Sequence, residues 1–141
     1  MKSSKQENLA RFHKIPVVQF EDQRLTSFGG VIVFQALFQH LGLKARLKDC
    51  FQHLTGSRIF GAHRIVLWLI VHLLLGFRRL RDVDYYRDDP LVQRLLGLRR
   101  LPDVATISRT LKSMDHTCVQ RVRHLSRDLV TDGLQREQFA R

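Results

Sequence analysis

Apolar residues recur at steps of three and four positions through most of the chain, which is the spacing of one helix face. The first stripe runs through residues 28–41, where Ser27 can cap the start of a helix and Gly42 can end it. A second stripe follows through residues 43–54 and has lysine and arginine on its opposite side. The pattern predicts amphipathic helices in this part of the chain.

The segment of residues 65–77 is apolar nearly all round. It is about 13 residues long and contains His72, whereas a membrane span needs about 20 apolar residues. We therefore predict a buried central helix over about residues 61–75, ended or kinked by Gly76. The neutral imidazole of His72 should find a hydrogen-bond partner inside the core.

Capping residues mark the helices of the second half. We expect a helix over residues 80–89, another over 90–97 with Pro90 in its first turn, one that starts after Asp103, and a last one from near His116. Together these make seven helices in one compact all-α domain over residues 24–141. Residues 1–23 should form a basic arm and a short extended segment, and one short N-terminal strand is the alternative form of that segment.

Charge narrows the choice of partner. The sequence carries 24 Lys and Arg against 13 Asp and Glu, a formal net charge of +11, which favours a polyanion. Nucleic acid is the first choice and an anionic membrane surface the second. Cys50 and Cys118 are far apart and form no Cys-x-x-Cys unit, so they indicate neither a disulfide framework nor a zinc site. With no apolar leader at the N-terminus, we expect a cytoplasmic location.

No pattern of catalytic residues is apparent. The acids at positions 82, 84, 88 and 89 alternate with arginines, which surface ion pairs explain without a metal. His124 and Asp128, four positions apart, are expected to be a solvated pair because no third ligand is evident. The sequence lacks an HExxH unit, a nucleophile elbow and a P-loop. We therefore predict no catalytic residue, no metal site and no cofactor for this chain.

Residues 90–114 read as helix, connection and helix, which resembles a helix-turn-helix with an unusually long connection. The second helix has a buried side, and its outward positions would contact DNA. Arg109 or Ser108 would then reach base edges, while phosphates would be held by Arg99, Arg100 and Lys112, with Thr106 on the same outward side. Ordinary helix packing is the alternative.

The order of the motifs carries a family resemblance. It runs from Ser-Phe-Gly-Gly at residues 27–30, through the Leu-Gly and Asp-rich stretch of 75–84 and the Asp-Pro step at 89–90, to Thr-x-Ser-Arg at 106–109. In this order the chain resembles the N-terminal region of DDE transposases of bacterial insertion sequences, in the branch called insertion sequence thirteen-eighty. The resemblance covers about residues 24–115.

The resemblance implies a role in DNA transposition, with the terminal repeats of the element as the DNA partner. Its catalytic carboxylates and their Mg²⁺ ions would belong to an RNase H-like core, and no residue here fits that triad. We therefore expect a truncated, DNA-binding fragment that is not an enzyme alone. A free-standing DNA-binding regulator or transposition inhibitor, acting as a homodimer, stays open, as does a membrane-surface or protein-interaction module.

Overall fold

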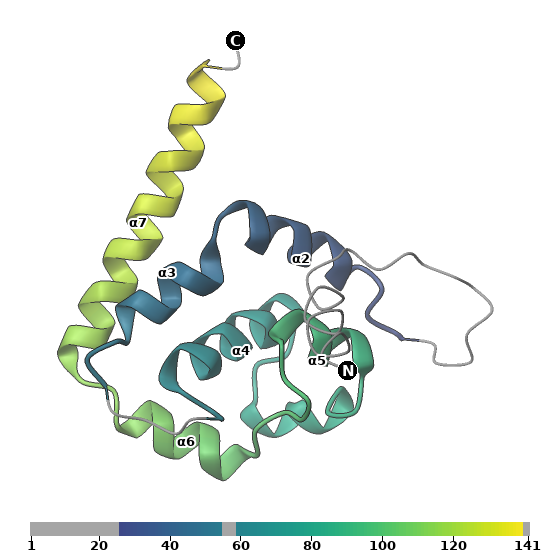
Figure 1. Cartoon of the computed structure of the whole chain (residues 1–141). Helices are drawn as coiled ribbons and strands as arrows, with labels where there is room; N and C mark the ends of the chain where they lie inside the picture. Colours follow the sequence, from purple (N-terminus) through teal and green to yellow (C-terminus); the bar gives the residue numbers. More distant parts are fainter. Residues whose placement is uncertain (1–25, 55–58, 140–141) are drawn as a thin grey trace, which may run out of the picture.

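The structure, a computed structural model, describes residues 26–54 and 59–139. Within these ranges the chain forms seven helices and no strand (Figure 1). They are α2 (Val31–His40), α3 (Leu43–Cys50), α4 (Ala62–Leu74), the 3-10 helix η1 (Leu80–Tyr85), α5 (Pro90–Leu96), α6 (Val104–Lys112) and α7 (His116–Phe139). The prediction of an all-α fold is confirmed, whereas the predicted arm and strand of residues 1–23 lie outside the described residues.

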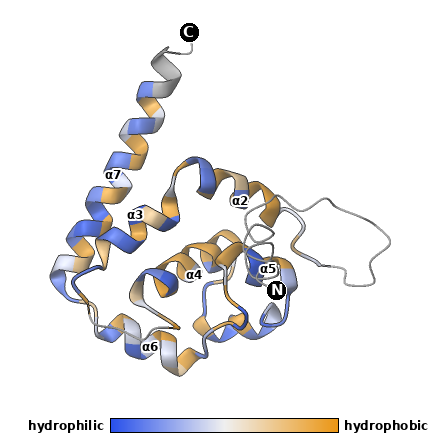
Figure 2. Cartoon of the chain, viewed as in Figure 1, coloured by the Kyte–Doolittle hydropathy of each residue, from blue (hydrophilic) through white to orange (hydrophobic). Residues whose placement is uncertain are grey.

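Helix α4 is the centre of the fold, as its apolar sequence predicted. It packs against α3, α5 and α6 and buries Ile65, Trp68 and Val71 almost completely. Figure 2 shows hydrophobic colour along most of α4, in contrast to the mixed surface of α7. None of the helices in the described ranges combines the length and the apolar composition that a membrane crossing requires.

A buried hydrogen-bond chain fixes the end of α4. His72 lies inside the core, where its Nε2 is 3.1 Å from the carbonyl oxygen of Arg79 and its Nδ1 is 2.6 Å from the hydroxyl of Tyr86. Because a carbonyl can only accept, Nε2 carries the proton and Nδ1 accepts from the tyrosine. The ring of Phe77 stacks on Tyr86 and lies tilted against His72. The prediction of a hydrogen-bonded core histidine is confirmed.

The start of α2 differs from the prediction. The helix begins at Val31 with Gly30 as its N-cap, and Ser27 does not cap it. The glycines just before Val31 are poor helix formers, so the helix starts after them. Thr26 holds the preceding turn instead, since its hydroxyl accepts from the amide of Phe28 (3.0 Å) and donates to Asp89 (2.6 Å).

The predicted helix over residues 80–89 is also wrong in length and type, because only the shorter η1 forms. Asp89 has an extended backbone (φ −70°, ψ 117°), as expected of a residue that precedes proline. Its carboxylate accepts from the amides of Leu91 and Val92, at 2.9 and 3.0 Å, and so caps α5. Pro90 stands in the first turn of α5 as predicted. At the other end of α5, Gly97 adopts the left-handed conformation (φ 68°) that ends a helix.

Helix α7 contacts α3 as far along as Asp132, and its C-terminal end projects beyond the other helices (Figure 1). Cys118 and Leu125 are buried in this contact region. The ion pair between Arg46 and Asp132, 2.8 Å long, joins the two helices near the outer edge of the contact. The start of α7 is therefore fixed to the body of the domain.

Candidate nucleic-acid interface

A groove of about 1030 Å³ runs beside α6. Its lining from α6 and the residue that follows consists of Thr106, Arg109, Thr110 and Ser113, which recur at steps of three and four and so share one helix face. The buried side of α6 is a different face, where Ile107 packs into the core. The sequence pattern separates these two faces, so α6 presents hydroxyls and one guanidinium to the groove.

Two further arginines reach the same groove from other parts of the chain. Arg87 follows η1, and Arg100 lies in the connection between α5 and α6. The guanidinium of Arg100 stands 5.9 Å from the centre of the Phe60 ring, a cation–π contact that orients it across the groove. Arg87 forms an ion pair with Asp84. Three segments of the chain thus bring positive charge to one concave surface.

The structure divides the predicted DNA-binding residues into two sets. The groove is lined by Arg100, Thr106 and Arg109. Outside its lining lie Arg99, Ser108 and Lys112, of which Ser108 is half-buried and the other two are exposed. Ser108 and Lys112, four positions apart, occupy the flank of α6 between the groove face and the core.

The side chain of Arg109 folds back along its own helix. Its Nε is 3.3 Å from the carbonyl oxygen of Ala105, and its terminal nitrogen is 3.4 Å from the hydroxyl of Thr106. Both are long for hydrogen bonds, so they hold the exposed guanidinium weakly. Arg109 can leave this position at little cost and extend into the groove.

Two acidic residues reduce the positive charge of the groove. Asp88 and Asp103 are part of its lining. Asp103 caps α6 as predicted, because its carboxylate accepts from the amide of Thr106 at 2.6 Å. That hydrogen bond lowers the pKa of Asp103, so the carboxylate stays charged at neutral pH. The N-cap of α6 therefore carries a negative charge, and the cationic residues Arg109 and Lys112 lie in its last turn.

The two helices of the predicted helix-turn-helix have different main partners. Helix α5 packs chiefly against α2 and α4, whereas α6 packs chiefly against α4 and η1. The long connection through residues 97–103 accounts for this separation, because it allows α6 to dock at a distance from α5. The helix-turn-helix itself stays a prediction.

Sequence reasoning missed several groove residues, among them Arg87, Thr110, Ser113 and His53. The step of three and four from Thr106 would have found Thr110 and Ser113. No local signal could have found Arg87 or His53, which reach the groove only through the packing of η1 and of the turn after α3.

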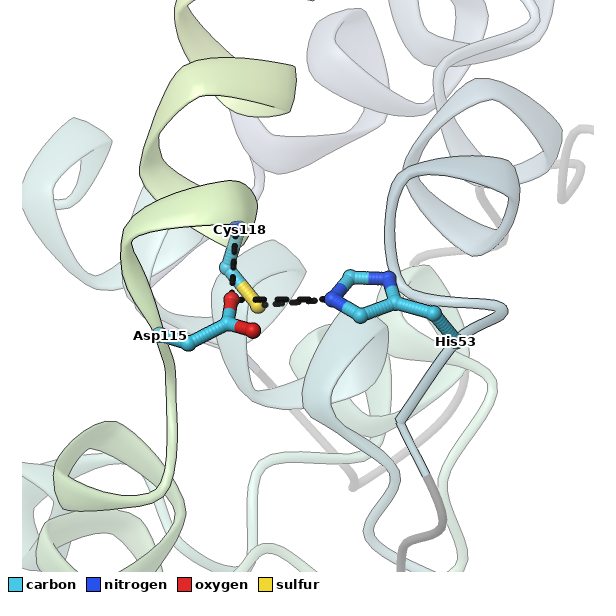
Figure 3. A group of neighbouring side chains, drawn as sticks. All are labelled: His53, Asp115 and Cys118. Carbon is cyan, nitrogen blue, oxygen red and sulfur yellow. Dashed lines mark hydrogen bonds and ion pairs between the residues drawn. The ribbon is translucent and has the colours of Figure 1, made fainter.

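His53 also belongs to a second group of side chains. It faces Asp115 and Cys118 at the start of α7 (Figure 3). Asp115 accepts from the amide of Cys118 at 2.9 Å, which lowers the pKa of Asp115 to about 2. Burial raises the pKa of the Cys118 thiol, so the thiol is protonated and a weak nucleophile at neutral pH.

The acids at positions 82–89 have separate structural tasks. Asp82 accepts from the backbone amide of Arg79 at 3.1 Å, Asp84 pairs with Arg87, and Asp89 caps α5. Only the Asp84 pair follows the predicted pattern of surface ion pairing. The other two carboxylates bind backbone amides instead.

Comparison with known proteins gives one family. The model of a family described as transposase DDE domain group 1 matches residues 10–140. No curated protein and no solved structure matches the chain.

This match corrects one expectation. The prediction that the chain is not an enzyme is wrong, because the family is one of transposase catalytic domains and the match gives no sign of a missing triad. The prediction had depended on finding no suitable carboxylates on expected strands. A search for acids on expected strands is too local a criterion for an enzyme, since the family match extends through the whole helical region.

Proposed function

The chain belongs to the transposase DDE domain group 1 family, and on this premise we propose that the groove beside α6 binds duplex DNA at the ends of a transposable element. The observation that carries the proposal is the convergence of Arg87, Arg100 and Arg109 on one concave surface. A transposase must hold the DNA that it moves, and phosphates are bound in proteins mainly by arginine and lysine.

Arg109 is the residue best placed to contact bases. It is exposed on the groove face of α6, and its planar guanidinium can donate two hydrogen bonds to the major-groove edge of guanine. Thr106 and Thr110 flank it with hydroxyl groups. The hydroxyl of Thr110 donates to the carbonyl oxygen of Thr106 at 2.9 Å and so can accept from DNA, while that of Thr106 can donate or accept. This face of α6 is therefore the proposed reader of sequence.

The other cationic residues would contact the phosphate backbone. Arg99 and Lys112 are exposed outside the groove lining, next in sequence to Arg100 and at the end of α6, where they can contact a duplex that extends beyond the groove. The N-cap carboxylate of Asp103 repels phosphates from the first turn of α6, and Asp88 adds a second negative charge to the groove lining. The duplex should therefore pass the last turn of α6 rather than its N-terminus, unlike the docking of a standard recognition helix.

The test measures the affinity of the whole chain for two duplexes by fluorescence anisotropy over a range of salt concentrations. One duplex carries terminal repeats, first those of the insertion sequence thirteen-eighty branch that the motif order favours, and the other a scrambled sequence. Arg109→Ala should lose about 1–3 kcal/mol on the repeat and little on the scrambled DNA. Arg99→Ala should weaken both alike and lower the salt slope by about one.

Arg123→Ala is the matched control, because Arg123 is exposed on α7 and does not line the groove. It should leave the affinity for both duplexes nearly unchanged, whereas Arg109→Ala weakens binding to the repeat and Arg99→Ala weakens binding to both. If Arg123→Ala and Arg109→Ala weaken binding to both duplexes equally, the affinity depends only on the net charge of the chain, and the groove is not the DNA site.

A further inference from the structure

We propose that His53, Asp115 and Cys118 form a binding site for a zinc-type divalent cation. Their donor atoms all lie within 4.8 Å of one another. The Nε2 of His53 is 3.6 Å from the Sγ of Cys118 and 3.6 Å from the Oδ1 of Asp115 (Figure 3). A cation there would fasten the turn after α3 to the start of α7.

The separations fit tetrahedral coordination. With metal–ligand distances of about 2.0–2.3 Å, two ligand atoms of a tetrahedral zinc ion stand roughly 3.3–3.6 Å apart. Two of the separations in the group already lie at this value. Small side-chain rotations therefore suffice to close the site, and the helices need not move.

The donor set selects the metal. A thiolate, an imidazole and a carboxylate together suit zinc, whereas Mg²⁺ and Ca²⁺ prefer oxygen ligands alone. Three protein ligands leave the fourth position of a tetrahedron to water. Cys118 is buried at the base of the group, while His53 and Asp115 are exposed above it. A hydrated ion can thus reach the site from solvent.

Binding requires two proton movements. The Cys118 thiol must lose its proton to solvent, because the thiolate is the form that binds a metal. The Nε2 of His53 must also become free. At present the guanidinium of Arg121 lies 3.0 Å from Nδ1, and since guanidinium only donates, Nδ1 accepts and Nε2 carries the proton.

Arg121 is therefore a competitor of the metal. When Nε2 binds the ion, the proton of the neutral ring moves to Nδ1, which can no longer accept from Arg121. The arginine must turn away from the ring, and its positive charge also repels the cation. The guanidinium nitrogen of Arg121 that now contacts His53 is also 3.3 Å from the carbonyl oxygen of Cys50. This carbonyl is an alternative acceptor that can keep Arg121 bound.

The test is a titration of the metal-free full chain with Co²⁺, followed by displacement with Zn²⁺. The wild type should bind one Co²⁺ per chain and show the near-ultraviolet charge-transfer band of a cobalt thiolate. Cys118→Ser should remove the band, whereas Cys50→Ser, the matched change at the other cysteine, should retain it. A band that persists in Cys118→Ser, or one that is absent from the wild type, would overturn the proposal.

Three surface variants decide the matter even if Cys118→Ser does not fold, which circular dichroism will show. His53→Gln should weaken Co²⁺ binding by at least about tenfold, since loss of an outer-shell partner alone costs that much. His124→Gln, at a histidine of α7 that is outside the group, should leave Co²⁺ binding unchanged. Arg121→Met should tighten binding, and unchanged affinity in both His53→Gln and Arg121→Met would refute this site.

Discussion

Replacing Tyr86 by phenylalanine isolates the buried hydrogen bond at the end of α4. The hydroxyl of Tyr86 is 2.6 Å from the Nδ1 of His72, and both residues are only 1% exposed. Burial raises the pKa of the tyrosine, so its hydroxyl remains a donor at any ordinary pH. The phenyl ring can keep the contacts with Phe28 and Phe77, so the change removes little besides one oxygen atom.

The expected cost follows from what the substitution leaves behind. Without the tyrosine hydroxyl, the Nδ1 of His72 is an acceptor that has lost its donor. The ring cannot move its proton to Nδ1 instead, because Nε2 must keep that proton for the carbonyl of Arg79. A buried acceptor without a partner costs about 1–3 kcal/mol. With a urea dependence of about 2 kcal/mol per molar, a loss of about 2 kcal/mol lowers the unfolding midpoint by roughly 1 M.

Urea unfolding followed by the fluorescence of Trp68 measures this directly. Trp68 is the single tryptophan of the chain, is fully buried, and has its ring 4.7 Å from that of His72. Tyr85→Phe is the matched control, because Tyr85 is 77% exposed and the same atom is removed. It should change stability by less than about 0.5 kcal/mol. Equal midpoints for Tyr86→Phe and Tyr85→Phe would refute the reasoning.

Two further predictions concern stability. Asp89→Ala should lower the free energy of unfolding by about 1–2 kcal/mol, because it removes the cap of α5 and the acceptor of Thr26. Asp89→Asn should lower the free energy of unfolding by less, and thermal melts of both variants will show which is the more stable. Burial lowers the pKa of His72 below its ordinary 6.5, so the folded chain binds fewer protons than the unfolded one in mildly acid solution. The stability this contributes is complete above about pH 6.5 and should fall as the pH drops below it, which urea titrations between about pH 7 and 5 will show. The pKa of Asp115, about 2, places its own loss of stability below about pH 4, outside that window.

Outside residues 80–89, the sequence predicted the helices well because each of them buries apolar residues. Helix α4, the cap Asp103 and the place of Pro90 in the first turn of α5 were predictable from local rules alone. The start of α2 was not, since Ser27 and Thr26 are both capable of capping a turn. Which hydroxyl is used depends on Asp89, a residue far along the chain that accepts from Thr26.

Contacts between distant segments explain what sequence reasoning missed at the sites. Arg100, Thr106 and Arg109 were found because they share one connection and one helix. His53 and Cys118 are 65 positions apart, and nothing in their spacing relates them. They meet only because α7 packs against α3. The periodicity shows that each of these helices has an apolar face, but it does not show which faces pack together.

The failed prediction at residues 80–89 and the missed groove residue Arg87 have one physical cause. Proline disfavours the helical conformation of Asp89 before it, so the predicted helix could not include Asp89. The chain leaves η1 after Tyr85 and turns through residues 86–88 before α5 begins. This turn brings Arg87 and Asp88 to the groove, and η1 packs against α6. The Asp-Pro step, which serves in the sequence as a helix boundary and as one of the family motifs, thus shapes one wall of the proposed DNA site.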